Sequence, residues 1–541
     1  MTTRTKIFAC CAILIALLPT LFFPLGTDHF TFLRGGEVVM NGGKIYADYY
    51  DQKPPMIYYI FGIGGEIFGY TEIGMRIYDL IFQISIVLSL LYVIRKRTSN
   101  VPLAYMIALI YAVSYTALNA SVTLQCESFA GLALVWLLYF QTALYSADMS
   151  GVAKVGHGNI LKGSSPALTL VLRGVCVGVA AGLKYPMGLA LIAVMLDDLL
   201  MMGFAPRKLL RYWSLTMLGV IGMLVLMLIP LFDSHVWLGY QRMWEYAVFY
   251  TSMPAVNSAF IRFLLKGLSR FLGDNYSFFS LVCIGASLAV FFRRDRESVV
   301  QRYHWIGFSF LLAVFLMGSI VIEKKLITYH FLRLYVPLSV LSGSGAMILF
   351  SAIRTHWKDF VLYQRGIAAM IACTLLVFSP FPRWMNLAIV PYYYYYAPGV
   401  YDAFFVTEGE TVSMRADMKR VARLIEADSS ARGGRTFAIA TYASAIYYHL
   451  NERPFSKLTY SVWYFSTVEI TGMRREFIEE LHGADWLVIE KDDHHPFLFG
   501  HSRSSKESLE RDTEAYSYVT EHFRLVQETE FFTVMKRLKT Q

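Results

Sequence analysis

The chain carries little charge for its length and very few cysteines. Only 16% of its 541 residues are charged, whereas 56% are hydrophobic, which excludes an ordinary soluble protein. The six cysteines lie within or at the ends of apolar segments, so neither a disulfide framework nor a metal site of cysteine type is predicted. The sequence also lacks a glycine-rich phosphate-binding loop, and its loops lack the Asp-x-Asp pattern of metal-dependent nucleotide-sugar sites. The sequence therefore gives no support for a protein that uses a nucleotide sugar as a donor.

Long apolar segments dominate the first two thirds of the chain. Each is long enough to cross about 30 Å of hydrocarbon. We predict eleven membrane-spanning helices, at roughly 7–25, 76–94, 101–118, 127–147, 167–183, 187–202, 212–232, 277–292, 303–321, 331–350 and 366–380. The first follows Arg4 and Lys6 and has no small-residue cleavage site, so we interpret it as a retained anchor and not as a signal peptide.

Basic residues concentrate in alternate loops, for example in Arg95-Lys96-Arg97 and around Arg293. By the positive-inside rule, these loops and the N-terminus face the cytoplasm, and the C-terminal part faces outward. The predicted location is a multi-pass protein of the cytoplasmic (inner) membrane. The net charge of +9 is then mostly a topology signal, and nothing in it favours nucleic-acid binding.

The composition changes after Pro380, and this change predicts two domains. Residues 391–396 read Pro-Tyr-Tyr-Tyr-Tyr-Tyr, which is typical of an aromatic anchor at a membrane boundary. We predict an α-helical polytopic membrane domain over 1–380 and an extracytoplasmic α/β domain over 381–541. In the second domain, alternation and helical periodicity predict the following elements: strands at 436–442, 486–490 and 531–536, and helices at 413–427 and 473–482.

Two of the outward loops contain predicted amphipathic helices. Loop 26–75 is long for a connector, which is typical of functional loops. In it, Asp28 can cap a helix over about residues 30–40 that ends at Asn41-Gly42-Gly43, and residues 56–68 form an apolar stretch too short to span. In loop 257–276, basic and apolar residues separate onto two faces of a helix, so we expect this helix at the membrane surface.

Polar residues collect at the outward ends of the predicted spans. They come from distant parts of the sequence, and no comparable mixture of acids and bases occurs at the inward ends. The set comprises Asp28, Asp48, Asp51, Lys53, Gln125, Glu127, Lys184, Lys324, Lys325, Tyr329, His330 and Arg333. We expect an outward-facing polar cavity that combines a base with several cations. Simpler roles stay open: cations near helix ends often extend to lipid head groups, Glu127 can stabilise a helix N-terminus, and Asp28 can be only a cap.

The first outward loop resembles that of GT-C glycosyltransferases that use polyprenyl-phosphate sugars, such as lipid A aminoarabinose transferases and protein O-mannosyltransferases. The shared pattern consists of an acid after the first span, a helix ending in glycine, a tyrosine, a Lys-Pro-Pro triplet, Phe-Gly and an arginine. Here these are Asp28, Gly42, Tyr46, Lys53-Pro54-Pro55, Phe68-Gly69 and Arg76. Residues 178–186 and 328–337 resemble two later motifs of the family. Many relatives have a second acid where this chain has His29.

The resemblance implies a membrane glycosyltransferase that transfers a sugar from a polyprenyl-phosphate donor to a lipid, polysaccharide or protein acceptor, with inversion, at the outer face. It implies that Asp28 is the base and that Glu127 orients the acceptor or assists. The residues implied to bind the lipid phosphate or sugar are Tyr46, Asp51, Lys53, Lys184, Lys325, Tyr329, His330 and Arg333. No cofactor is predicted, and a divalent metal is an alternative that no pattern in the sequence supports.

Two other functions compete with sugar transfer. A transporter or flippase of lipid-linked glycans could use the same polar cavity, and a glycan polymerase or ligase would join preassembled chains. Transporters often contain internal repeats and polar residues at mid-membrane. We find no repeat, and the ionisable residues gather at one surface, with Arg173 as the main exception. The sequence therefore favours an enzyme.

Overall fold

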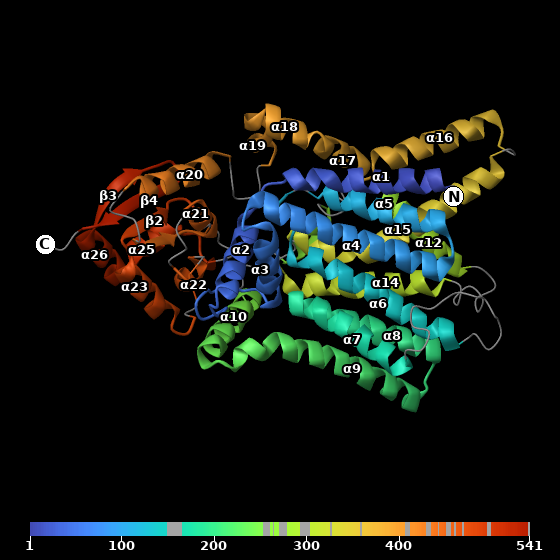
Figure 1. Cartoon of the computed structure of the whole chain (residues 1–541), viewed down its shortest axis with the longest axis horizontal. Coiled ribbons are helices and arrows are strands. Elements are labelled where there is room, and N and C mark those ends of the chain that lie inside the picture. Colours follow the sequence, from blue (N-terminus) through green and yellow to red (C-terminus); the bar gives the residue numbers. More distant parts are fainter. Residues whose placement is uncertain are drawn as a thin grey trace. The chain divides into compact units, whose positions relative to one another are not determined.

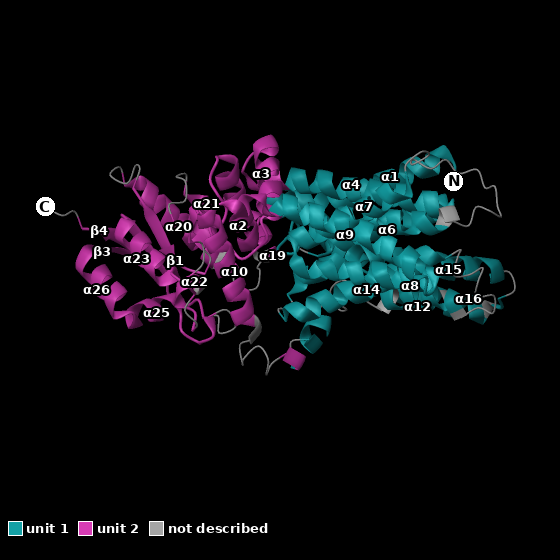
Figure 2. Cartoon of the chain, turned by 90° about the horizontal axis from the view of Figure 1, so that it is seen from below, with its two compact units in different colours: residues 1–23, 76–227, 262–396 teal, residues 24–75, 228–261, 397–541 magenta. Residues whose placement is uncertain are grey.

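The computed structural model describes most of the chain, and every structural statement below concerns these residues. They are residues 1–118, 120–148, 165–252, 260–262, 264–269, 278–292, 303–324, 327–357, 360–405, 412–428, 434–441, 443–450, 456–458, 461–467, 470–494 and 499–538. The chain forms two compact units (Figure 2). Unit 1 contains residues 1–23, 76–227 and 262–396, and unit 2 contains residues 24–75, 228–261 and 397–541.

Unit 1 consists of helices in its described part (Figure 1). Their bounds are α1 Thr3–Leu17, η1 Leu18–Phe22, α4 Glu72–Thr98, α5 Val101–Thr116, α6 Cys126–Asp148, α7 Pro166–Leu183, η2 Tyr185–Leu189, α8 Ala190–Met202, α9 Pro206–Leu228, α12 Phe278–Leu288, η4 Ala289–Phe292, α14 His304–Glu323, η5 Thr328–Leu334, α15 Tyr335–His356, α16 Leu362–Val377, α17 Phe381–Ala388 and α18 Val390–Tyr396. All eleven predicted apolar segments are helical over most of their described length.

The described helices support a polytopic membrane domain but do not confirm the predicted number of spans. Eight described helices are long and apolar enough to cross a membrane, or nine if the bent pair Tyr363–Val377 and Phe381–Tyr396 is one span. Two further helices at predicted spans, Val101–Thr116 and Ser280–Phe291, are apolar but shorter in the described chain, and residues 277 and 293 on either side of the second lie outside it. The count of eleven is therefore not confirmed.

Small residues allow two helices of unit 1 to approach closely. A Cβ atom on Gly174 of α7 would lie 1.9 Å from the backbone oxygen of Thr216 in α9, and one on Gly219 of α9 would lie 2.1 Å from the oxygen of Val171. Neither position has room for any side chain. Close backbone contact through small residues is how helices pack where lipid removes the hydrophobic driving force.

Unit 2 contains helices and one small sheet. Its described helices are α2 Thr27–Met40, α3 Met56–Phe68, η3 Ile229–Phe232, α10 Ser234–Ser252, α19 Pro398–Phe404, α20 Val412–Ala427, α21 Ala443–His449, α22 Val462–Phe465, α23 Met473–Gly483, α25 Ser505–Arg511 and α26 Thr513–His522, and its strands are β1 Thr436–Ile439, β2 Trp486–Glu490, β3 Phe523–Glu528 and β4 Phe532–Arg537. The strand order is β1-β2-β4-β3. Strands β1 and β2 are parallel, with Thr436 opposite Trp486, and the other two pairs are antiparallel.

Three of the four strands follow the sequence prediction, and β3 does not. The predicted segments at 436–442, 486–490 and 531–536 correspond to β1, β2 and β4, and the two predicted helices correspond to α20 and α23. Strand β3 begins directly after α26, without a turn residue that would mark the boundary. Most of its side chains are exposed, so a buried alternating pattern is missing as well.

The first loop packs on the segment after residue 396 within unit 2. The hydroxyl of Thr31 in α2 donates to the hydroxyl of Ser444 in α21 at 3.0 Å, and the backbone N–H of Tyr50 donates to the oxygen of Lys457 at 2.9 Å. Tyr50 also meets the indole of Trp463 edge to face. The predicted division at residue 380 stays a prediction, and the compact units instead place loop 24–75 with residues 397–541.

The predicted interfacial helix at 257–276 lies only partly within the described chain. Residues 260–262 and 264–269 are helical, and Arg262 is exposed. The remaining positions, including Arg270, lie outside the described residues, as does Lys325.

Candidate functional site

Asp28 lies in the first turn of α2, but it does not cap the helix as predicted. The helix begins at Thr27 instead of about residue 30, with Gly26 at the N-cap, and the backbone N–H of Gly26 donates to Nδ1 of His29 at 2.8 Å. Asp28 is therefore the second helical residue and not the N-cap residue. The Asp28 carboxylate is near the positive end of the helix dipole, which favours a negative charge there.

Asp28 and Lys53 form an ion pair inside unit 2. The Lys53 Nζ lies 3.9 Å from Oδ2 of Asp28 and 5.8 Å from the ring centroid of Phe32. The Lys53 side chain is 9% exposed, whereas that of Asp28 is 27% exposed. The carboxylate is thus the accessible partner, and the ammonium is held behind it.

Asp51 is a buried neighbour of this pair. Its Oδ2 accepts a hydrogen bond from the hydroxyl of Tyr58 in α3 at 2.6 Å. Burial raises the pKa of Asp51 to about 6, although the charge of Lys53 and the Tyr58 hydroxyl both oppose the rise. The charge of Asp28 adds to the rise in pKa. Asp51 therefore exchanges its proton closer to neutral pH than an ordinary aspartate does.

Tyr46 supports the backbone that carries Lys53. Its hydroxyl donates to the backbone oxygen of Lys53 at 2.5 Å. The residue has a φ of 70°, in the left-handed region that side chains rarely adopt. Gly239 of α10 makes room for this turn, because a Cβ atom there would lie 2.1 Å from the Tyr46 oxygen. These contacts give Tyr46 a positioning role for Lys53.

A second cluster of charged side chains lies inside unit 1 and joins four helical segments. Lys184 follows α7, and its Nζ lies 3.0 Å from Oε1 of Glu127 in α6 and 3.3 Å from Oε2 of Glu323 in α14. Arg333 of η5 lies 2.9 Å from the same oxygen of Glu127 and 2.8 Å from Oε1 of Glu323. Both cations are therefore paired with carboxylates and do not extend to lipid head groups.

Aromatic and imidazole groups complete the second cluster. The Lys184 Nζ lies 5.2 Å from the ring centroid of Tyr329, and Nε2 of His330 lies 3.5 Å from Oε2 of Glu323. Four predicted site residues are thus brought together with Glu127: Lys184, Tyr329, His330 and Arg333. Glu323 was not predicted. The available signal was an acid at the last position of an apolar helix, where the dipole disfavours it.

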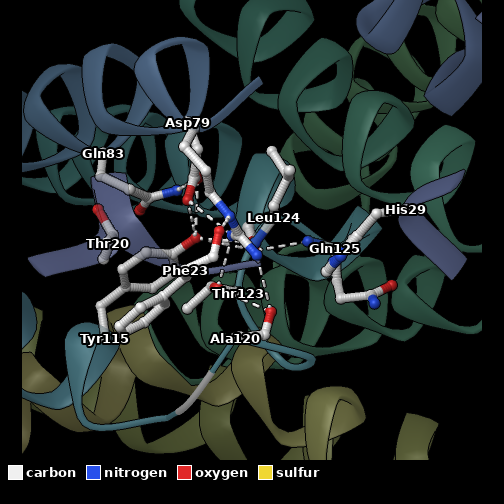
Figure 3. A network of polar contacts seen from close by, with 12 residues as sticks. Thr20, Phe23, His29, Asp79, Gln83, Tyr115, Ala120, Thr123, Leu124 and Gln125 are labelled. Atoms are coloured by element: carbon white, nitrogen blue, oxygen red, sulfur yellow. Dashed lines mark hydrogen bonds and ion pairs between the residues drawn. The ribbon is translucent and has the colours of Figure 1, made fainter. Parts of the chain in front are cut away.

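A buried polar network fixes the loop that leads to Glu127 (Figure 3). Arg76 donates to the backbone oxygens of Phe23 and Ala120, at 2.8 and 3.1 Å. The hydroxyl of Tyr115 donates to Asp79 at 2.8 Å and accepts from the backbone N–H of Leu124 at 3.0 Å. Leu124 has a φ of 61°, a strained value for a leucine, so this bond holds a turn two residues before α6.

A third ion cluster of unit 1 lies at the other end of α14. The guanidinium of Arg173 in α7 forms two bonds with Asp198 in α8, at 2.8 and 3.0 Å. Nε2 of His304, the first residue of α14, lies 2.8 Å from Oδ2 of Asp197. Gln141 of α6 donates to both aspartates. Arg173, the main exception to the gathering of ionisable residues at one surface, is completely buried and paired with Asp198.

Three of the remaining predicted polar residues lie within the described chain: Asp48, Gln125 and Lys324. Asp48 accepts from the backbone N–H of Lys44 in a turn, and Gln125 donates to the backbone oxygen of Ser121. Lys324 ends α14 with a φ of 55°. In the described part of the chain, no group of three or more His, Cys, Asp or Glu side chains is arranged to hold a metal ion.

Among the comparisons with known proteins, only the comparison with solved structures covers the whole chain. A family model for dolichyl-phosphate-mannose-protein mannosyltransferases matches residues 52–151, and no curated protein matches the chain. The structure of ArnT from Cupriavidus metallidurans bound to undecaprenyl phosphate aligns with 100% of this chain and 99% of its own, at 12% identity and a TM-score of 0.56.

A second solved structure is similar over most of the chain. The archaeal oligosaccharyltransferase AglB from Archaeoglobus fulgidus, in complex with an inhibitory peptide and a dolichol-phosphate, aligns with 90% of this chain and 70% of its own. The identity is 12% and the TM-score is 0.52. ArnT in the apo state aligns with 99% of this chain at a TM-score of 0.53. At these identities the likeness concerns the fold.

Proposed function

The chain has the fold of the GT-C glycosyltransferase superfamily, as its sequence predicted, and we propose that it is a membrane glycosyltransferase with a polyprenyl-phosphate sugar as its donor. The acceptor would be a hydroxyl of a lipid, polysaccharide or protein at the outer face of the cytoplasmic membrane. A donor that cannot leave the bilayer requires reactive groups at the membrane surface. The matched family model and the lipid phosphates named with both solved neighbours support this donor class.

The observation that carries the proposal is the pair of Asp28 and Lys53. A partly exposed carboxylate at a helix N-terminus, with a buried ammonium 3.9 Å behind it, can accept a proton and remain fixed in place. In this role Asp28 takes the proton of the acceptor hydroxyl as its oxygen attacks the anomeric carbon. The bond between this carbon and the phosphate oxygen breaks, and the polyprenyl phosphate leaves with the electron pair. In-line attack inverts the anomeric centre.

The leaving group is a phosphate, so cations can stabilise it without a general acid. As the resemblance implied, Lys53, Lys184 and Arg333 stay the proposed phosphate-binding groups. Glu127 pairs with both unit 1 cations through one oxygen, and it is proposed to orient them or the acceptor. Lys325 keeps the role that the resemblance implied, although it lies outside the described residues.

The decisive experiment compares Asp28→Asn with the wild-type protein, reconstituted with a synthetic polyprenyl-phosphate monosaccharide. Removal of a general base typically costs about 10²- to 10⁴-fold in rate, so we expect kcat to fall by that amount while donor binding persists. Asp48→Asn is the matched control, because Asp48 is an exposed acid of the same loop. Near-normal turnover by Asp28→Asn would disprove the base assignment, and movement of donor across vesicles without sugar transfer would favour a flippase.

A further inference from the structure

The carboxylate of Glu323 lies at the centre of three cationic or ionisable nitrogen groups. Its oxygens are 2.8 Å from Nη1 of Arg333, 3.3 Å from Nζ of Lys184 and 3.5 Å from Nε2 of His330. Three nitrogen groups converging on one pair of oxygens form the type of site that proteins use for a phosphate group. In this structure the anion in that site belongs to the protein itself.

The helix that carries Glu323 disfavours its negative charge. Glu323 is the last residue of α14, and Lys324 follows it in the left-handed conformation. The unsatisfied carbonyls at a helix C-terminus repel an anion. The end of the helix therefore does not favour this charge, whereas the nitrogen groups of Arg333, Lys184 and His330 do.

The two carboxylates of the unit 1 cluster differ in this respect. Glu127 is the second residue of α6, at the favourable end of its helix, and its side chain is completely buried. The side chain of Glu323 is 11% exposed, and that of Lys184 is 10% exposed. Glu323 is thus the carboxylate that can leave toward solvent, whereas Glu127 must stay.

Departure of Glu323 would change the charge of the site. Lys184 and Arg333 carry two positive charges, and Glu127 alone would then balance only one of them. Buried charge without a partner is costly, so the opened site requires an incoming anion. A phosphate group offers more oxygens than a carboxylate to the same three nitrogen groups.

We propose that Glu323 is an internal occupant of a phosphate site formed by Lys184, Arg333 and His330, and that a polyprenyl phosphate displaces it on binding. This inference rests on the proposed function, because it assigns the phosphate of the same donor and of the released carrier to these residues. Glu323 would weaken carrier binding, which helps the product to leave after each transfer.

Competition of this kind has a measurable consequence for affinity. A ligand that binds only the opened state shows an apparent Kd divided by the fraction of open molecules. If Glu323 occupies the site in nine molecules of ten, its removal tightens binding about tenfold. A carboxylate that only fastened helices together would give the opposite sign, because its removal would loosen the site.

The first experiment measures binding of undecaprenyl phosphate to the full-length protein in detergent. We expect Glu323→Gln to bind it about tenfold more tightly than wild type, with Glu66→Gln, an exposed acid elsewhere, unchanged. Inorganic phosphate should show the same ratio with weaker binding if the head group alone is recognised. If only undecaprenyl phosphate shows this ratio, its isoprenoid tail also contributes to the displacement of Glu323. Equal or weaker binding of undecaprenyl phosphate by Glu323→Gln overturns the proposal.

A second experiment needs no variant and therefore does not depend on its folding. Carboxyl groups of the wild-type protein are labelled with a water-soluble carbodiimide and a nucleophile, with and without undecaprenyl phosphate, and the peptides are quantified by mass spectrometry. Displacement predicts faster labelling of Glu323 when the lipid is bound, with Glu127 unlabelled in both states. Slower or unchanged labelling of Glu323 overturns the proposal.

These outcomes are separable from those of the Asp28→Asn experiment. If the protein transfers sugar and Asp28→Asn does not, but Glu323 fails both tests, the enzyme assignment stands and the internal occupant is wrong. If no sugar is transferred but the lipid displaces Glu323, the phosphate site stands without the proposed reaction.

Discussion

Two buried ion clusters of unit 1 use the same three helices and differ in how completely their charges are satisfied. Helices α6, α7 and α14 contribute Gln141, Arg173 and His304 to one cluster. The other receives Glu127 and Glu323 from α6 and α14, and Lys184 from the position after α7. On α14, His304 is the first residue and Glu323 is the last, so the clusters lie at opposite ends of this helix.

The cluster around Arg173 is closed. Each carboxylate oxygen of Asp198 accepts from the guanidinium of Arg173, and Oδ1 also accepts from the hydroxyl of Tyr145 at 2.6 Å. Both oxygens of Asp197 lie within hydrogen-bond distance of His304 Nε2. A buried network with every charged oxygen satisfied stabilises one arrangement of its helices.

The cluster around Glu127 is open by comparison. Both cations bond to Oε1 of Glu127, and among the described residues its Oε2 has no hydrogen-bond partner. Lys184 and Glu323 also reach solvent. The same kinds of charged residue thus serve two purposes in one helical unit: a closed cluster fastens helices, and an open cluster can exchange one partner for a ligand.

The largest expected effect breaks the closed cluster. Among the described residues, Arg173→Met leaves the buried carboxylate of Asp198 without an ion-pair partner, and we expect a loss of about 3–5 kcal/mol in stability. Thermal unfolding in detergent measures this loss, and Arg354→Met, which removes an exposed arginine, is the control. If Arg173→Met is as stable as the control, the closed cluster does not stabilise the packing of its helices.

The next effect opens the second cluster further. Lys184→Met removes one proposed phosphate-binding cation, and such groups are worth about 10²- to 10³-fold in rate. We expect kcat/KM for sugar transfer to fall by at least about 100-fold, with a smaller loss of thermal stability than in Arg173→Met. Lys208→Met, which removes an exposed lysine, is the control for charge. If Lys184→Met loses as much stability as Arg173→Met and its rate of sugar transfer is unchanged, both clusters serve only to stabilise helix packing.

The smallest effect extends the comparison to unit 2. The pKa of Asp51 is raised from 3.8 to about 6, so the fold favours its protonated form. This stabilisation is complete below about pH 4 and is lost as the pH rises through 6, by at most about 1.4 kcal/mol per pH unit.

Asp51→Asn mimics the protonated group and isolates this effect. Relative to wild type, the variant should gain thermal stability between pH 4 and pH 7, because only the wild-type side chain acquires a buried charge. The difference in Tm between the two proteins, measured across this range, tests the sign. A difference that does not vary with pH would show that Asp51 keeps one charge state throughout.

The sequence was most informative where one physical constraint acts over many neighbouring residues. Apolar segments can be predicted directly because a membrane span requires them. The end of α2 could be predicted because Gly42, just after the helix, adopts a φ of 83° that favours glycine. Strand β3 was missed because its exposed side chains carry no alternating pattern. The N-cap was predicted at Asp28 because aspartate often caps a helix, whereas the structure has Gly26 at this position.

The site residues show more clearly what cannot be predicted from neighbouring residues in the sequence. Lys184 and Arg333 were predicted from their place at helix ends, but their partners could not be. Glu323 precedes Lys324 and Lys325, so in the sequence it belongs to a charged flank of a span. Its importance arises from groups 139 and 10 positions away, Lys184 and Arg333, which only the tertiary fold brings near. The roles proposed for these residues in the reaction stay predictions.

The packing of the first loop on residues after 396 has a consequence for biosynthesis. Asp28 and Lys53 emerge early from the ribosome, whereas Ser444 and Lys457, which hold Thr31 and Tyr50, are made much later. A nascent chain can therefore insert its helices long before its first loop has the surface on which to settle. An interrupted translation product would reach the membrane with its proposed base unanchored, so only a finished polypeptide would acquire the proposed activity.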